Sequence, residues 1–197
     1  MAESCTRGER LDRKRRKKEL FRLVRAIGIA MLAVVVIRLF FVMPAVVNGA
    51  SMMPTIEDGD YVLLNKLGPA MSGYDRFDIV VFEAGQNENY IKRIIGLPGD
   101  HIEYVEDELW INGERFAEPY LDEYKEALTD RGPLTRDFTI DGALGQSVVP
   151  EGHYFVLGDN RRGSLDSRSP EVGFVSADAI IGKASLIFWP FEHVRLF

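Results

Sequence analysis

Apolar residues follow two different patterns in the two parts of the chain. From Ala26 to Val47 they form one nearly continuous run, AIGIAMLAVVVIRLFFVMPAVV, with a single charged residue, Arg38, and a single proline, Pro44. About 20 helical residues are enough to cross the hydrocarbon core of a bilayer, which is about 30 Å thick. The run therefore predicts one transmembrane helix, over residues 21–43.

Beyond this run the pattern is typical of β-strands. Turn-forming glycines and prolines recur about every ten residues, and short stretches rich in β-branched and aromatic residues lie between them. These stretches are 61–65, 78–82, 90–95, 101–105, 108–111, 154–157 and 179–188. Evenly spaced short strands favour an antiparallel sandwich or barrel. We therefore expect a mainly β fold, an antiparallel β-sandwich-like or barrel-like domain over residues 44–197, behind one N-terminal transmembrane helix.

One part of this domain has a different character. Residues 113–150 are more polar and less regular than the segments on either side. Residues 119–131, PYLDEYKEALTDR, contain enough helix formers for one short helix. We therefore expect an insertion or flap at about 113–150.

Charge divides the chain at the same place as hydropathy. The chain has 197 residues and a net charge of −6, but residues 1–25 carry +6 and the rest carry −12. Basic residues flank transmembrane helices on the cytoplasmic side. We therefore expect a cytoplasmic tail over residues 1–20, one pass through the cytoplasmic membrane in contact with lipid, and a β domain outside the cytoplasm. The acidic domain argues against a nucleic-acid partner.

A basic segment followed by an apolar run is also the pattern of a cleaved signal peptide. This run is longer than the apolar core of a signal peptide, and the nearest set of small residues, Asn48-Gly49-Ala50, comes only after it. We therefore favour an anchor. The only cysteine, Cys5, lies in the tail, so the exported domain is expected to fold without a disulfide.

The sequence lacks the common motifs of metal, nucleotide and Ser-His-Asp sites. Its three histidines, His101, His153 and His193, are scattered, and no glycine-rich phosphate-binding motif occurs. We therefore expect no metal or cofactor. Four segments remain that carry candidate chemistry: NGASMMPTI (48–56), GDYVLLNK (59–66), YIKRIIGLPGD (90–100) and GDNRRGSLDSR (158–168).

With these four segments in this order, the chain resembles the type I signal peptidases, bacterial membrane-bound serine proteases with a Ser-Lys dyad. The resemblance extends from about residue 35 to the end of the chain. It implies cleavage of the signal peptides of exported preproteins after small residues, at the outer face of the membrane and near the secretion machinery. It implies no cofactor.

The resemblance assigns Ser51 as the nucleophile and Lys92 as the general base. A lysine can act as a base when burial lowers its pKa. Lys66 and Lys183 also lie in apolar stretches, so only the motif selects Lys92. The Ser51 backbone N–H is implied to form part of the oxyanion hole. Gly49 stands where many family members have a serine as a second donor.

Other site residues also follow from the resemblance. Ser164 is expected to hydrogen-bond and orient the base lysine, Asp166 and Arg168 to form an ion pair, and Asp159 and Asn160 to shape the turn. The pocket nearest the cut would be lined by Met52, Ile56 and Tyr90, and the next one by Ala45, Val47 and Ile91. The substrate would pair there as an added strand.

Two other functions stay open at this point. One is another Ser-Lys peptidase of the same architecture, such as the self-cleaving repressors that respond to DNA damage. The anchor and the lack of a DNA-binding domain count against it. The other is an inactive membrane-anchored β scaffold that binds exported proteins, against which the intact Ser51, Lys92 and Ser164 count.

Overall fold

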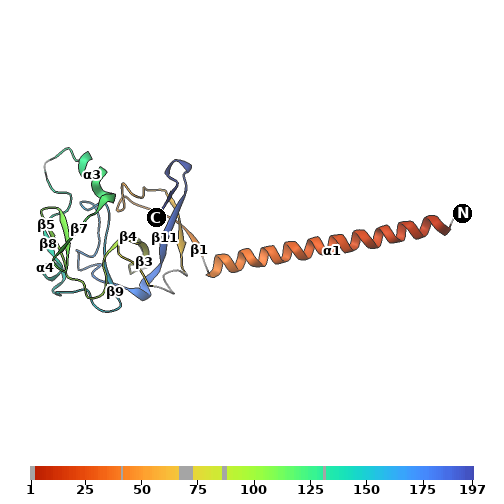
Figure 1. Ribbon diagram of the computed structural model, residues 1–197, viewed down its shortest axis with the longest axis horizontal. Helices are drawn as coiled ribbons and strands as arrows, with labels where there is room; N and C mark the ends of the chain where they lie inside the picture. Colours follow the sequence, from red (N-terminus) through yellow and green to blue (C-terminus); the bar gives the residue numbers. More distant parts are fainter. Residues whose placement is uncertain (1–2, 41, 67–72, 86–87, 131) are drawn as a thin grey trace. The chain divides into compact units, whose positions relative to one another are not determined.

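The structure is a computed structural model, and the chain forms two compact units, Met1–Phe41 and Val42–Phe197 (Figure 1). It describes residues 3–40, 42–66, 73–85, 88–130 and 132–197. The first unit is helix α1 (Glu3–Phe40), which takes in both the basic segment and most of the apolar run. Lys, Arg, Glu and Leu are all favourable helix formers, so the charged segment continues the same helix. In the described part of the chain, no helix is at once long enough and apolar enough to cross a membrane.

The boundaries of this helix differ from the predicted ones. Helix α1 begins at Glu3 rather than at residue 21, and strand β1 (Val42–Val46) begins inside the predicted helix 21–43. Pro44 explains the early end, because proline has no N–H for a helical hydrogen bond and is tolerated in an edge strand such as β1. Residues 1–2 and 41 of the predicted tail and helix lie outside the described residues.

The second unit is mainly β and antiparallel, as predicted. Its larger sheet has the strand order β1-β2-β11-β3-β4-β9-β10, with β12 paired to β11. Besides β1, its strands are β2 (Tyr61–Asn65), β3 (Ile79–Glu83), β4 (Asn89–Gly96), β9 (His153–Leu157), β10 (Val175–Ser176), β11 (Ile180–Trp189) and β12 (Arg195–Leu196). The short helices η2 (Ala177–Ala179) and η3 (Phe191–His193) flank β11.

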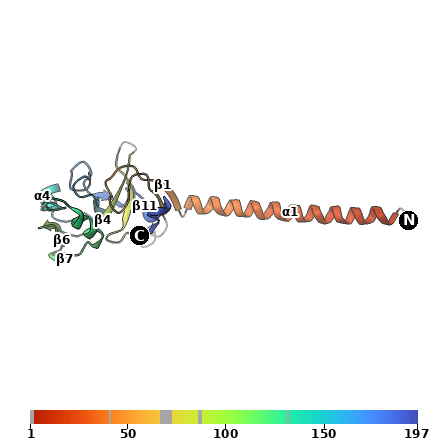
Figure 2. The ribbon, with the colours of Figure 1, turned by 90° about the horizontal axis from the view of Figure 1, so that it is seen from above.

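A second, four-stranded sheet has the order β7-β6-β5-β8. Its strands are β5 (Ile102–Val105), β6 (Glu108–Ile111), β7 (Glu114–Phe116) and β8 (Phe138–Thr139). The expected insertion at 113–150 contributes β7 and β8 to this sheet, and it also contains η1 (Pro119–Leu121), α3 (Asp122–Ala127) and α4 (Ile140–Leu144). Both views place β7 and α4 at one end of the second unit and β1 and β11 at the other, with β4 between them (Figures 1 and 2).

The central strands are apolar on both faces. Along β3, Ile79 and Val81 belong to one buried cluster and Val80 and Phe82 to another, because successive side chains of a strand point to opposite faces. Strand β9 divides in the same way, and its Phe155 packs between the sheets with the side chains of β5 and β6. The larger sheet is therefore covered on both sides, which holds the loops at its edge in fixed positions.

Candidate active site

Ser51 lies in a turn that directly follows strand β1. Two hydrogen bonds fix the start of this turn, from the Val47 N–H to the Asp60 carbonyl at 2.8 Å and from the Gly59 N–H to the Val47 carbonyl at 2.9 Å. The Ser51 side chain is half-buried and lines a groove of about 490 Å³. The predicted nucleophile is therefore held by backbone contacts and still reaches an open space.

Lys92 lies on β4 with its amine against Ser51. Its Nζ donates hydrogen bonds to the Ser51 Oγ at 2.7 Å and to the Ile91 carbonyl at 2.9 Å. The residue is only 3% exposed. Burial lowers the pKa of Lys92 from 10.5 to about 8, and the carboxylates of Asp166 and Asp159 act in the opposite direction. A neutral amine is thus accessible near neutral pH, within hydrogen-bond distance of a hydroxyl.

The other two lysines in apolar stretches are placed differently. Lys183 forms an ion pair with Asp78. Lys66 follows β2 and does not line the groove. Of these three lysines, the structure brings only Lys92 to Ser51.

Asn160 holds the segment that carries Ser51. Its backbone N–H donates to the Ser51 carbonyl at 3.1 Å, and its side-chain Nδ2 donates to the Ala50 carbonyl at 3.0 Å. The Tyr124 hydroxyl donates to the Asn160 Oδ1 at 3.3 Å. Asn160, expected only to shape its own turn, therefore also fixes the backbone around the nucleophile.

Two ion pairs stabilise the loop that contains Asn160. Asp159 is completely buried and binds the Arg93 guanidinium through both carboxylate oxygens, at 2.9 and 2.6 Å. Asp166 is also buried and binds Arg168, with both oxygens at 2.8 Å from the guanidinium. Bidentate pairs of this kind fix the orientation of both partners. The loop is therefore tied to β4, next to Lys92.

One expectation for this loop needs correction. The predicted hydrogen bond between Ser164 and Lys92 is absent from the structure. The Ser164 Oγ is buried and has no hydrogen-bond partner among the described residues, because Lys92 is directed toward Ser51 and the Ile91 carbonyl instead. Ser164 packs against Gly158, where an added methyl group would collide with its hydroxyl.

Two strand edges face the groove. In the described residues, β1 pairs only with β2, and the first half of β4, Asn89–Lys92, pairs only with β3. Both strands contribute residues to the groove wall. Unpaired strand edges offer backbone N–H and C=O groups to an extended peptide. The groove can therefore accept a peptide strand that passes Ser51.

The predicted pocket residues divide into two sets. Ala45, Val47, Tyr90 and Ile91 line the groove, as do Gly163 and Leu165, which the sequence did not indicate. The prediction that Met52 and Ile56 line the pocket nearest the cut is corrected, since both side chains are completely buried and do not line the groove. They belong to the same apolar cluster as Val47 and Ile91 and so support the groove wall from within the core.

Gly49 has a backbone conformation that suits glycine. Its φ is +100°, and its N–H donates to the Asp58 carboxylate at 2.7 Å. A side chain at this φ would be strained. The Ser51 N–H, in contrast, has no acceptor among the described residues, so it is free to bind a developing oxyanion.

Several residues of the site were missed by sequence reasoning. Arg93 directly follows Lys92, so its position beside the predicted base could have identified it as a site residue. Arg161 is buried and forms an ion pair with Glu118, and it also donates a hydrogen bond to the Tyr104 hydroxyl at 2.6 Å. No local pattern links residues so far apart in the chain. Across the described residues, no group of three or more His, Cys, Asp or Glu side chains could hold a metal ion.

Comparison with known proteins gives consistent relatives. Residues 20–189 match the family described as signal peptidase, peptidase S26. The chain is 48% identical to a signal peptidase I of Bacillus caldolyticus over 165 residues, which are 84% of this chain and 89% of that protein. It is 38% identical to a signal peptidase IB of Staphylococcus aureus (strain Mu50) over 183 residues, 91% and 94% of the two chains. The crystal structure of a signal peptidase I from Enterococcus faecalis V583 has a TM-score of 0.53 and 43% identity, covering 56% of this chain and 95% of that one.

Proposed function

We propose that this chain, a serine peptidase that belongs to the signal peptidase family, peptidase S26, removes signal peptides from exported preproteins. The observation that carries the proposal is the 2.7 Å hydrogen bond between the Lys92 Nζ and the Ser51 Oγ. A nucleophile and a base within hydrogen-bond distance are what covalent catalysis requires. The low pKa of the buried lysine supports the same roles.

In the proposed mechanism, the neutral Lys92 amine takes the proton of the Ser51 hydroxyl as its oxygen attacks the scissile carbonyl carbon. The Ser51 N–H stabilises the oxyanion. Lys92 then gives the proton to the leaving amine of the mature protein, and the signal peptide remains as an ester on Ser51. Water attacks this ester and gives a proton to Lys92, which returns it to the Ser51 oxygen as the ester bond breaks.

The groove supports a preference for small residues before the cut. We propose that the substrate binds as a strand between β1 and the open half of β4, with its side chains against Ala45, Val47 and Ile91, which line the groove. These wall residues belong to, or pack against, a cluster of buried residues. Protein interiors are closely packed, so the wall cannot easily move aside for a large side chain.

We place the enzyme in the bacterial cytoplasmic membrane with its β domain outside the cytoplasm. The apolar run and the basic segment before it support this topology. The β domain also exposes large apolar side chains near its C-terminus: Trp189, Phe191, Val194 and Leu196. Exposed apolar surface of this kind is typical of a site of membrane or protein contact. Signal peptides emerge at such a membrane surface.

The function is tested with a purified preprotein in detergent. Wild type should release the mature protein, and Ser51→Ala and Lys92→Ala should each lose nearly all turnover. Lys66→Ala is the matched control, because this lysine does not line the groove. Near-normal turnover of either dyad variant would exclude the proposed mechanism.

The topology is tested separately with intact cells whose wall has been removed. An added protease should digest residues 44–197 and spare the tail, and the chain should stay with the membrane in high salt or carbonate. Protection of the β domain, or release of the chain into the soluble fraction, would contradict the proposed location.

A further inference from the structure

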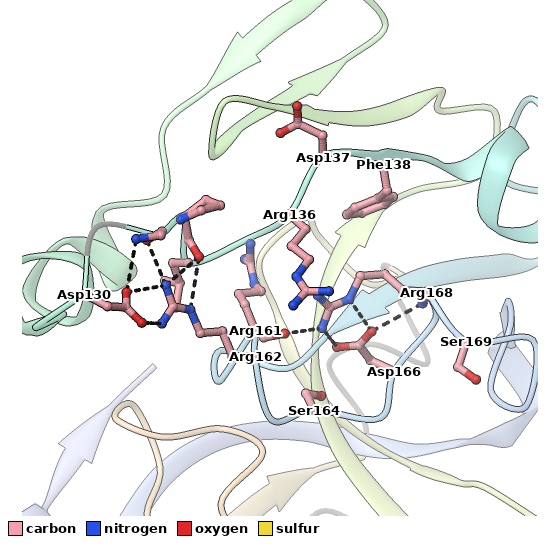
Figure 3. Close-up of a pocket in the computed structure, with 13 residues that line it drawn as sticks. Asp130, Arg136, Asp137, Phe138, Arg161, Arg162, Ser164, Asp166, Arg168 and Ser169 are labelled. Atoms are coloured by element: carbon pink, nitrogen blue, oxygen red, sulfur yellow. Dashed lines mark hydrogen bonds and ion pairs between the residues drawn. The ribbon is translucent and has the colours of Figure 1, made fainter.

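A second cavity of the β domain lies outside the groove. It has a volume of about 710 Å³ and lies between residues 132–138, together with Asp130, on one side and residues 161–169 on the other (Figure 3). Four arginines line it: Arg136, Arg161, Arg162 and Arg168. This concentration of positive charge is unusual here, because the chain after residue 25 carries a net charge of −12.

In two of the four guanidinium groups, every nitrogen donates a hydrogen bond within the protein. Arg161 is completely buried and donates to Glu118, Tyr104, Thr135 and the Gly158 carbonyl. Arg162 donates to Asp130 and to the carbonyls of Gly132 and Pro133. Every guanidinium nitrogen of these two arginines thus has a partner, and both arginines shape the cavity.

The other two retain free donors. Arg136 has no hydrogen bond or ion pair with any described residue, so all five of its N–H groups are available. Arg168 binds Asp166 through Nε and Nη2, which leaves its Nη1 without a partner in the described part of the chain. Both residues line the same cavity.

The acidic groups around the cavity do not neutralise Arg136. Asp130 is bound by Arg162, and Asp166 by Arg168. Asp137 accepts a hydrogen bond from the Glu106 N–H. Its carboxylate points away from the Arg136 side chain, which extends toward the cavity (Figure 3). An anion in the cavity would thus meet one uncompensated guanidinium and further free donors on Arg168.

The cavity adjoins the groove through a shared loop. Gly163 and Leu165 line the groove with Ser51, whereas Arg162, Ser164 and Asp166 line the cavity. A peptide that lies along β1 and passes Ser51 reaches the loop 158–164, since Gly158 and Asn160 contact the Ser51 carbonyl. A substrate whose residues after the scissile bond follow this loop would bring them to the cavity.

From these placements we infer that the cavity binds an acidic side chain of the substrate's mature part, with Arg136 and Arg168 as its partners. This inference rests on the proposed function and extends it to the substrate residues just after the cut. A carboxylate suits planar guanidinium groups with several free N–H donors. The apolar groove would then select the small residues before the cut, and the cavity would select charge after it.

The test uses peptides with one signal-peptide part and Asp, Asn or Lys at the second and third positions after the cut. Wild type should cleave the Asp peptide with a kcat/KM about threefold to tenfold above that of the Asn peptide, and the Lys peptide less well than either. High salt should reduce the difference. Arg136→Ala should bring the ratio of Asp to Asn to about one, and Arg136→Glu should reverse it.

Arg115→Ala is the matched control, because Arg115 is an exposed arginine that binds Glu108 and does not line the cavity. It should keep the wild-type ratio. Equal cleavage of the Asp and Asn peptides by wild type, or an unchanged ratio in Arg136→Ala, would overturn the inference. Inhibition by inorganic phosphate with no peptide charge preference would also overturn it, since the cavity would then take only a free anion. If wild type cleaved none of the peptides, the proposed function itself would be contradicted.

Discussion

Asn160 donates a hydrogen bond from its side-chain nitrogen to the carbonyl oxygen of Ala50, the residue before Ser51, over 3.0 Å. The two residues are 110 positions apart in the chain. Because the Asn160 N–H also binds the Ser51 carbonyl, both peptide groups around the nucleophile are held by one residue. This arrangement fixes the direction of the Ser51 side chain relative to Lys92.

Replacement of Asn160 by alanine should therefore impair catalysis more than folding. Asn160→Ala removes the bond to Ala50 and keeps the backbone bond to Ser51. We expect kcat to fall about tenfold to a hundredfold and KM to change little, because small displacements of the reacting groups slow the chemical step. Tyr124→Phe removes only the 3.3 Å contact to Asn160 and should cost much less. Steady-state kinetics measures the effect on catalysis, and thermal unfolding measures the effect on stability. A normal kcat in Asn160→Ala would refute the role of Asn160 in positioning Ser51.

The pKa of Lys92 predicts the pH dependence of cleavage. The base must be neutral, and burial lowers the pKa of Lys92 to about 8. Activity should therefore rise with pH through about 8 and then level off. Lys92→Arg should be inactive over the whole range, since arginine stays protonated. The measurement is kcat/KM against pH, and a flat profile from acid to alkaline pH would be incompatible with a lysine base.

Gly158 leaves no room for a larger side chain beside the active site. A methyl group there would collide with the Ser164 side chain and with the backbone carbonyl of Ser51. Gly158→Ala should therefore destabilise the β domain by about 1–3 kcal/mol and strongly reduce cleavage. Gly28→Ala in α1 is the control, because nothing lies within 4 Å of its added methyl group. Chemical denaturation and turnover should be compared, and a fully active Gly158→Ala variant would show that the contact relaxes freely.

His193 is expected to make a pH-dependent contribution to the free energy of unfolding. Its Nδ1 lies 2.8 Å from the buried Asp60 carboxylate, and this hydrogen bond, with Glu57 nearby, raises the pKa of His193 above 6.5. A raised pKa means that the charged form stabilises the fold below pH 6.5 and that this gain is lost as pH rises through the folded-state value.

The difference in free energy of unfolding between wild type and His193→Gln should accordingly be largest at acid pH and should shrink toward alkaline pH. His153→Gln is a suitable control, since that ring contacts a backbone carbonyl rather than a carboxylate. Urea denaturation at several pH values measures both, and a constant difference for His193→Gln would rule out the ionic contribution.

Much of the strand pattern could be predicted from sequence because it depends on near neighbours. Residues 61–65 and 108–111 form strands with the predicted bounds, and each of the other predicted strands differs by one residue at one or both ends. Strand β1 was missed because its residues continue the apolar run, and only Pro44 hinted at a change. The short strands β7, β8, β10 and β12 carried too little pattern to be recognised.

The sequence by itself determined the residue types, the alternation of the strands and the two motifs that contain Ser51 and Lys92. The tertiary structure decided which groups meet: Lys92 reaches Ser51 across 41 positions, and Arg93 reaches Asp159 across 66. It also decided that Met52 and Ile56 are buried and that Ser164 lacks the expected partner. Local preferences act over a few residues, whereas burial and ion pairing depend on strand order, and strand order is fixed only when the whole core packs.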